Sequence, residues 1–293
     1  TEGNTKIPVS FQEGPTTKTL VTEENNGGLE MIKWLEDAVF YEVYPQSFRD
    51  SNGDGIGDIP GITEKLEYIQ ELGCNALWIN PCFTSPFYDA GYDVEDYYSV
   101  APRYGTNEDL KKLFEAAHQR GMHVLLDLVP GHTAVTHPWF QESMKAEKNE
   151  YTDRYVWTDS LYKRMEDVKG IVSVLRGISP RPGQLRASTV FSTQPALNYG
   201  FANITDAGWQ QPTDAPGPMA TREELKNIMR FWLTLGCERF PCGYGRFAGE
   251  KREDKKETIR LWQDVRAFLN KEFPEAALVS EWGKTGGGTG SGI

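Results

Sequence analysis

The sequence lacks several features that mark special classes of protein. It has four cysteines and four histidines, without a Cys-x-x-Cys pair or a zinc-ligand spacing. No apolar run approaches the roughly 20 residues needed to cross a bilayer, and residues 1–30 contain no apolar segment of a signal peptide. The net charge of −11 argues against nucleic acid or an anionic membrane as the main partner. We therefore expect a cytoplasmic monomer with reduced thiols.

The two ends of the chain differ in amino-acid composition from its middle. Residues 1–30 are rich in Thr, Glu, Asn and Gly and carry no sustained period, so we expect a disordered leader before a natural start at Met31. Residues 285–293 are rich in glycine but lack the Lys and the following helix of a phosphate-binding loop. We expect a flexible tail there.

One apolar stretch in the middle of the chain predicts a strand that ends in reactive side chains. The run at 122–129 has no amphipathic alternation, as expected of a buried parallel strand, and Asp127, a Pro-Gly break and His132 follow its core. Parallel strands of a (β/α)₈ barrel place catalytic groups at their carboxyl ends in this way. The alternative is a core strand followed by an ordinary polar loop.

Strands and helices alternate before this stretch. Residues 39–44 and 75–79 are rich in strand-forming side chains, and helical spacing follows each of them, at 62–69 and at 110–117. Thr106 or Asn107 is a suitable N-cap for the second helix, and Gly121 closes it. Two such units leading into a third parallel strand imply an α/β barrel or a doubly wound sheet.

The alternation lapses after His132 and then resumes. Residues 133–220 are too long for a simple loop, so we expect a subdomain inserted after strand three. A capping-box-like start at Thr221 predicts the next helix, the segment 237–245 is a poor strand because of its Pro and Gly, and a strand at 277–281 ends in Glu281. The predicted parts are barrel strands one to three at 31–132, the subdomain at 133–220, and barrel strands four and five at 221–284.

Residues 50–58 place oxygen donors at alternate positions with glycines between them. Such a loop can wrap a hard cation, but position twelve of an EF-hand would be Gly61 here instead of Glu. We predict a calcium site of another kind, and the alternative is a solvated turn rich in Asx residues. The expected ligands are Asp50, Asn52, Asp54, the Ile56 carbonyl and Asp58.

Taken together, in order and spacing, six segments resemble the N-terminal half of the catalytic domain of the α-amylase family of glycoside hydrolases. The similarity is greatest to its oligo-1,6-glucosidase, α-glucosidase and trehalose synthase branch. The family implies a (β/α)₈ barrel of TIM type with a subdomain after strand three, here truncated after about strand five. The segments are Tyr41–Phe48, Asp50–Asp58, Asp89–Asp93, Asp127–His132, Gln194–Asn198 and Ser280–Trp282.

The resemblance also implies a retaining mechanism on α-linked gluco-oligosaccharides, with two carboxylates in complementary roles. Glu281 would be the general acid/base, and its alternative is a strand-end carboxylate paired with Lys or Arg. His132 would donate to a glucose hydroxyl, and its alternative is a loop imidazole hydrogen-bonded to the backbone. Tyr92 would stack on the same sugar, and its alternative is a packed aromatic side chain. Asp89 would bind hydroxyls of that sugar, and its alternative is a turn cap. In the family, Asp127 orients an arginine on strand four.

Two positions depart from the family pattern. Gly131 stands where many α-amylases have Asn, which weakens a second calcium site. At strand four the motif Gly-Phe-Arg-Val-Asp aligns with Arg239–Gly243, so the nucleophile position is Gly243, and glycine cannot form a glycosyl ester. Permitted codons for residues 239–251, read one base out of frame, restore the motif, so we infer a local frameshift. We expect an inactive, truncated copy of a glycoside hydrolase, or a silent sugar- or calcium-binding remnant that need not fold.

Overall fold

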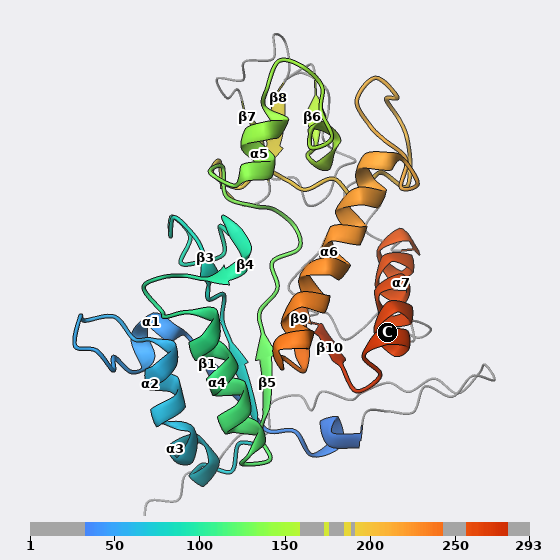
Figure 1. Cartoon of the computed structure of the whole chain (residues 1–293). Coiled ribbons are helices and arrows are strands. Elements are labelled where there is room, and N and C mark those ends of the chain that lie inside the picture. Colours follow the sequence, from blue (N-terminus) through green and yellow to red (C-terminus); the bar gives the residue numbers. More distant parts are fainter. Residues whose placement is uncertain (1–32, 159–172, 176–184, 189–190, 243–255, 281–293) are drawn as a thin grey trace, which may run out of the picture.

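The structure is a computed structural model, and it describes residues 33–158, 173–175, 185–188, 191–242 and 256–280. A five-stranded parallel sheet organises the lower part of the molecule in Figure 1. Its order is β1 (Phe40–Val43), β2 (Ala76–Ile79), β5 (His123–Leu126), β9 (Arg239–Cys242) and β10 (Ala277–Ser280).

The strand order distinguishes between the two predicted architectures. Each new strand of the chain is added beside the previous one, and the direction never reverses. Right-handed crossovers in one direction place all connecting helices on the same face of the sheet, as in a barrel. A doubly wound sheet would instead reverse its order at a switch point. The expected TIM-barrel type is therefore confirmed, while truncation after strand five stays a prediction.

The helices that connect the strands flank the sheet in two groups (Figure 1). The helices within residues 45–118 lie beside β1, and the helices within residues 216–272 lie beside β9 and β10. Within the described ranges no helix is long and apolar enough to cross a membrane. The helical elements are η1 (Lys33–Asp37), α1 (Pro45–Phe48), α2 (Ile59–Glu64), α3 (Leu66–Glu71), α4 (Asn107–His118), α5 (Pro138–Ser143), η2 (Thr152–Arg154), α6 (Pro216–Leu235) and α7 (Lys256–Glu272).

Two helix starts test the sequence reasoning. Helix α4 begins as predicted, because Thr106 and Asp109 form a reciprocal capping box. Helix α6 does not begin at Thr221: Pro216 occupies its first position, where a missing N–H costs nothing. Thr221 lies inside the helix, and its Oγ1 donates to the Gly217 carbonyl at 3.1 Å.

The segment after α6 was expected to be a poor strand, and this expectation was wrong. Arg239–Cys242 forms β9, which pairs in parallel with β10 along its length and with β5 only at Leu125–Arg239. Pro241 has no N–H to donate, but β9 pairs with β5 only at Arg239, so this pairing requires no hydrogen bond from Pro241. Phe240 is fully buried in the core, so burial of one aromatic side chain supports the strand.

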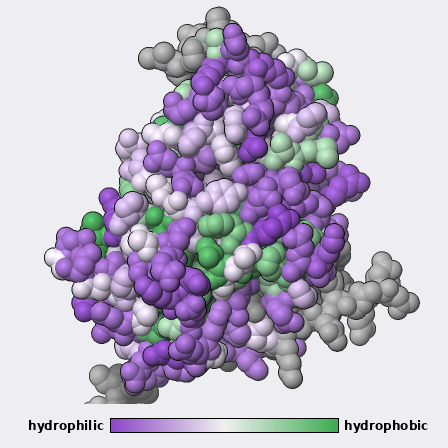
Figure 2. Space-filling view, in the orientation of Figure 1, coloured by the Kyte–Doolittle hydropathy of each residue, from purple (hydrophilic) through white to green (hydrophobic). Residues whose placement is uncertain are grey.

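Two small sheets lie toward the carboxyl ends of the main strands (Figure 1). The hairpin of β3 (Phe83–Thr84) and β4 (Asp96–Val100) lies between β2 and α4 in the chain. The second sheet has the order β6 (Trp157–Thr158), β8 (Leu185–Ser188), β7 (Ser173–Leu175). It lies between β5 and α6 in the chain, within the predicted subdomain, whose limits at 133 and 220 stay predictions. The face of the molecule in Figure 2 is mainly hydrophilic, with hydrophobic residues gathered near its middle.

Candidate functional site

Polar side chains meet just beyond the carboxyl ends of β2 and β5. Asp127 follows β5, and its backbone N–H donates to the Ile79 carbonyl at 2.9 Å, so the sheet fixes its position. The Tyr92 hydroxyl donates to Asp127 Oδ2 at 3.1 Å, and Asn80 Nδ2 donates to that hydroxyl at 3.4 Å. Burial and the nearby Asp127 carboxylate raise the pKa of Tyr92. The phenol is therefore a permanent hydrogen-bond donor at neutral pH.

The loop that carries Tyr92 is built around one buried carboxylate. Asp93 is fully buried, and it accepts hydrogen bonds from Ser85 Oγ (2.9 Å), the Tyr88 backbone N (2.8 Å) and the Asp89 backbone N (3.1 Å). At Gly91 the backbone is left-handed with φ 103°, and an added Cβ would lie 2.8 Å from a neighbouring carbonyl oxygen. This position therefore requires glycine.

Asp89 links this loop to a distant segment of the chain. Its Oδ2 accepts a hydrogen bond from Gln194 Nε2 at 2.6 Å, and Gln194 itself is fully buried. Burial raises the pKa of Asp89, and the bond from Gln194 opposes that effect. A carboxylate has two oxygens that accept hydrogen bonds, so Asp89 can accept from a hydroxyl in addition to Gln194.

His132 lies against the same loop. Its Nε2 lies 2.9 Å from the Tyr92 carbonyl oxygen, which can only accept, so Nε2 carries the proton. Burial lowers the pKa of His132 to about 4, against the influence of this hydrogen bond. The imidazole is therefore neutral at physiological pH. Its observed partner is the backbone, which agrees with the alternative interpretation, and donation to a glucose hydroxyl stays a prediction.

The structure thus brings together four of the five residues predicted for catalysis and sugar binding: Asp89, Tyr92, Asp127 and His132. Glu281 and the nucleophile position Gly243 lie outside the described residues. Sequence reasoning named the segment around Gln194 without giving it a role, and it missed Asp93 and Asn80 as site-building residues. A polar residue directly after a predicted strand was an available signal for Asn80; the partners of Gln194 and Asp93 follow only from the fold.

The predicted calcium loop is curled by its own side chains. Asp50 accepts backbone hydrogen bonds from Asn52, Gly53 and Gly55, and the N–H groups of Gly55 and Gly53 lower its pKa. Asn52 and Asp54 each accept from the backbone N two residues further on. Asp58 Oδ1 caps α2 through the Gly61 N–H at 2.7 Å, and its Oδ2 accepts from Ser51 Oγ at 2.8 Å.

These bonds bear on how well the loop fits a metal. The donor atoms are the oxygens that calcium prefers. An oxygen that accepts a single hydrogen bond, such as Asp50 Oδ2 or Asp54 Oδ1, retains acceptor capacity. In the part of the chain that the structure describes, however, no group of three or more His, Cys, Asp or Glu is arranged to hold a metal ion. The side chains therefore fit calcium in type, whereas their placement is that of Asx turns.

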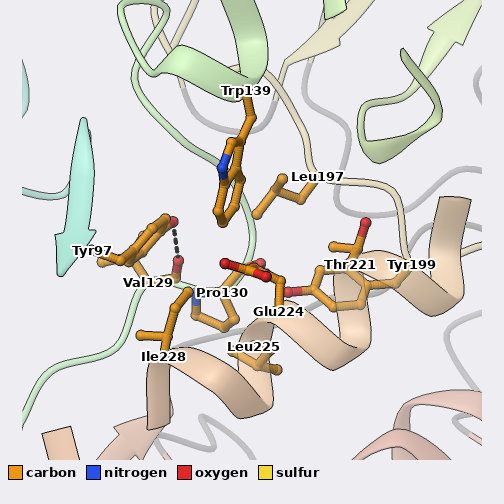
Figure 3. Close-up of a pocket in the computed structure, with 10 residues that line it drawn as sticks. All are labelled: Tyr97, Val129, Pro130, Trp139, Leu197, Tyr199, Thr221, Glu224, Leu225 and Ile228. Carbon is orange, nitrogen blue, oxygen red and sulfur yellow. Dashed lines mark hydrogen bonds between the residues drawn. The ribbon is translucent and has the colours of Figure 1, made fainter. Parts of the chain in front are cut away.

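A separate pocket lies between α6 and the loops above it (Figure 3). It holds about 240 Å³, including space open to solvent, and none of the predicted site residues lines it. The Tyr97 hydroxyl donates to the Val129 carbonyl at 2.8 Å in its wall, and Glu224, beside it, accepts from Tyr98 at 2.8 Å. The lining is mainly apolar: Tyr97, Val129, Pro130, Trp139, Leu197, Tyr199, Thr221, Glu224, Leu225 and Ile228.

Known proteins share both the sequence and the fold. The family model for the alpha-amylase catalytic domain matches residues 42–241. The trehalose synthase/amylase of Mycolicibacterium smegmatis is 37% identical over 272 residues, which cover 90% of this chain and 42% of that protein. An oligo-1,6-glucosidase of Heyndrickxia coagulans is 48% identical over 214 residues, 71% of this chain and 35% of that protein.

Solved structures agree. A trehalulose synthase mutant superposes with a TM-score of 0.67 at 33% identity, covering 84% of this chain and 45% of that one. The trehalose-6-phosphate hydrolase of Bacillus licheniformis superposes with a TM-score of 0.67 at 29% identity, covering 86% and 45%. The chain therefore spans less than half the length of these relatives. The family model matches residues 42–241, and the strand order is that of the family's barrel. The chain therefore belongs to the α-amylase family of glycoside hydrolases.

Proposed function

We propose that this chain binds the terminal glucosyl unit of α-linked gluco-oligosaccharides at the carboxyl ends of β2 and β5. The observation that carries the proposal is the hydrogen-bonded group of Asp89, Tyr92, Asp127, His132 and Gln194, which comes from three separate segments of the chain. Sugars are recognised by polar acceptors for their hydroxyls together with an aromatic face for their C–H surface. The group supplies both. Relatives with this fold include oligo-1,6-glucosidases and trehalose synthases.

Each residue has a role in this proposal. The Asp89 carboxylate accepts hydroxyl hydrogens of the glucose, and Gln194 holds its second oxygen in place. Tyr92 offers its ring to the sugar while its hydroxyl is fixed by Asp127. His132 fixes the loop by donating from Nε2 to the Tyr92 carbonyl. In the family role, this N–H would exchange the carbonyl for a hydroxyl of the bound glucose.

We further propose that the bound sugar is not turned over. A retaining glycosidase needs a carboxylate nucleophile and a second carboxyl group that protonates the leaving oxygen. Glu281 matches the second group, but the position of the first is Gly243, which has no side chain to attack with. Groups that act as a unit fail together, so loss of the nucleophile removes most of the activity. The ancestral reaction is hydrolysis or transfer at an α-glucosidic bond.

Calcium in the 50–58 loop is part of the same proposal, as a structural ion with no role in the reaction. Ligands would come from Asp50, Asn52, Asp54, the Ile56 carbonyl and Asp58, which are oxygen donors of the kind the ion prefers. A bound ion would replace some of the backbone partners that these side chains have now.

The test uses the full chain and measures binding and turnover separately. Calorimetry with maltose, with and without calcium chloride, should show binding, and 4-nitrophenyl α-glucoside should release no product above buffer. Asp89→Ala should weaken maltose about ten-fold or more, because a charged hydrogen-bond acceptor is lost. Glu108→Ala, an exposed carboxylate on α4, is the matched control. Release of 4-nitrophenol would contradict the proposal that the bound sugar is not turned over. Equal maltose affinity in the wild type, Asp89→Ala and Glu108→Ala would contradict the sugar site.

A further inference from the structure

Two buried tyrosines hold the backbone that leads to His132. The Tyr97 hydroxyl lies 2.8 Å from the Val129 carbonyl oxygen and 2.8 Å from the His132 carbonyl oxygen, and Figure 3 shows the first of these bonds. Because a hydroxyl has one hydrogen, Tyr97 shares it between the two carbonyls. The Tyr199 hydroxyl donates to the Pro130 carbonyl at 2.7 Å. The turn is therefore fixed by side chains that lie 35 residues before His132 and 69 residues after Pro130.

A backbone donor completes this set of bonds. The Leu197 N–H donates to the Gly131 carbonyl at 3.1 Å, so each of the consecutive carbonyl groups of residues 129–132 accepts a hydrogen bond from outside the turn. Buried carbonyl groups need a donor, and Pro130 has no N–H with which the turn could supply one itself. The course of this turn therefore depends on the tyrosine hydroxyls.

Tyr97 is itself held in one place by the barrel and the subdomain. Its side chain is buried, and its backbone carbonyl accepts a hydrogen bond from Trp232 Nε1 on α6 at 2.7 Å. Its ring stacks on Trp139 of α5 with the centroids 6.0 Å apart. Burial raises the pKa of Tyr97 well above its usual range, so the hydroxyl keeps its proton. The hydroxyl is therefore a fixed donor to the turn.

We propose that Tyr97 and Tyr199 are positioning residues for sugar binding, because their hydroxyls fix the turn so that the His132 imidazole stays beside the bound glucose. This inference rests on the proposed sugar site and adds to it two residues from the wall of the separate pocket. The backbone of His132 is bonded at its carbonyl and bridged to Ala196, so rotation of the side chain is what remains to move Nε2. The imidazole N–H then exchanges the Tyr92 carbonyl for a sugar hydroxyl without a rearrangement of the turn, and little conformational entropy is lost on binding.

The experiment is a double-mutant cycle on maltose affinity, measured by calorimetry on the full chain. Tyr97→Phe removes the hydroxyl and keeps the buried ring. It should weaken maltose about two- to ten-fold, the range expected when one hydrogen bond to the sugar is impaired. Tyr199→Phe should weaken maltose less, because its partner is Pro130 and not His132 itself. In a chain that already carries His132→Ala, Tyr97→Phe should cause no further loss, because the group that it positions is gone.

A matched control and a direct measurement accompany the cycle. Tyr98→Phe removes a neighbouring hydroxyl on β4 that donates to Glu224 at 2.8 Å and not to the turn, so it should leave maltose affinity unchanged. Magnetic resonance of nitrogen-labelled histidine reports how fast the His132 Nε2 proton exchanges with water. This exchange should be several-fold faster in Tyr97→Phe than in the wild type or in Tyr98→Phe, because the imidazole is held less firmly against the Tyr92 carbonyl.

The outcomes separate a positioning role from a merely structural one. If the wild type binds maltose and Tyr97→Phe weakens it equally with and without His132→Ala, or not at all, the positioning role is overturned and the sugar site stands. An unchanged exchange rate of the His132 proton in Tyr97→Phe overturns it as well. If Tyr97→Phe does not fold, the same cycle with Tyr199→Phe decides. If the wild type does not bind maltose, the proposed function fails and the positioning role fails with it.

Discussion

The strand β5 carries polar groups at both of its ends, and the two ends are built differently. At its start, His123 Nδ1 lies 2.9 Å from Glu238 Oε2, and His118 Nε2 lies 3.5 Å from the same oxygen. The Trp34 ring packs on His123 with the centroids 4.2 Å apart. These three titratable side chains are partly exposed, at 25%, 30% and 37% for His123, Glu238 and His118.

At the far end of the strand the groups are buried. Asp127 is 6% exposed and His132 is 9% exposed, and both bond to Tyr92 in another loop. The start of the strand joins neighbouring elements of the barrel, α4, β5 and β9. The far end joins long loops that the barrel supports without determining their course. In barrels of this type the amino-terminal end of the strands contributes stability and the carboxyl-terminal end carries chemistry.

This contrast gives a general expectation for substitutions. Changes at the far end should alter sugar affinity and stability together, because the same buried bonds shape the loop and the site. Changes at the start should alter stability alone.

The largest effect is expected at Asp93. Asp93→Ala removes the acceptor for Ser85, Tyr88 and Asp89 and leaves buried donors unpaired, at a cost of roughly 3 kcal/mol in the free energy of unfolding. Maltose binding should be lost at the same time. Urea unfolding and calorimetry on the same samples measure both effects. Asp93→Asn keeps one acceptor oxygen and should lose less stability and less maltose affinity. An Asp93→Ala chain with wild-type stability and wild-type maltose affinity would contradict the expected difference between the two ends of β5.

The next largest effect is the pH dependence of stability at the carboxyl end of β5. Burial lowers the pKa of His132 from 6.5 to about 4, so the unfolded chain binds a proton that the folded chain rejects over this range. Stability from this group is fully present above pH 6.5 and falls as the pH drops toward 4, by up to about 3 kcal/mol. His137, whose pKa burial lowers to about 3, adds to the loss.

The measurement is the free energy of unfolding between pH 7 and pH 4. His132→Asn should flatten the profile relative to the wild type, and His132→Asn with His137→Asn should flatten it further. Because Asn is always neutral, its curve isolates the histidine contribution. A wild-type profile as flat as that of the double variant would show that neither imidazole is held neutral by burial.

The sequence predicted the barrel because its signals are local. Apolar runs marked β1, β2 and β5, and the candidate N-caps Thr106 or Asn107 marked the start of α4, where capping depends on residues within one turn. The start of α6 was predicted too late because Thr221 with Glu224 also satisfies a capping pattern. Pro216 at the first helical position was the stronger signal.

Non-local packing decided what the sequence could not predict. Pro241 argued against a strand, but burial of Phe240 and pairing with β10 along the whole of β9 outweigh that local preference. In the site, Asp89, Tyr92, Asp127 and His132 lie close together, whereas the bond between Asp89 and Gln194 joins positions far apart in the chain. No periodicity reports such a contact. Propensity is a weak guide wherever tertiary contacts override it.

The smallest effect is expected at the start of the strand, at Glu238. Burial alone would raise the pKa of Glu238, but hydrogen bonds and charge from His118 and His123 lower it overall from 4.5. Its stabilisation is therefore present above pH 4.5 and is lost as the pH falls through the lowered value. Glu238→Gln should cost about 1 kcal/mol at pH 7, because the site is partly exposed and solvent screens the charges. The difference from the wild type should disappear near pH 3, and maltose affinity should be unchanged at pH 7. A loss of maltose affinity in a chain of near-wild-type stability would show that the two ends of β5 are coupled and would end the contrast between them.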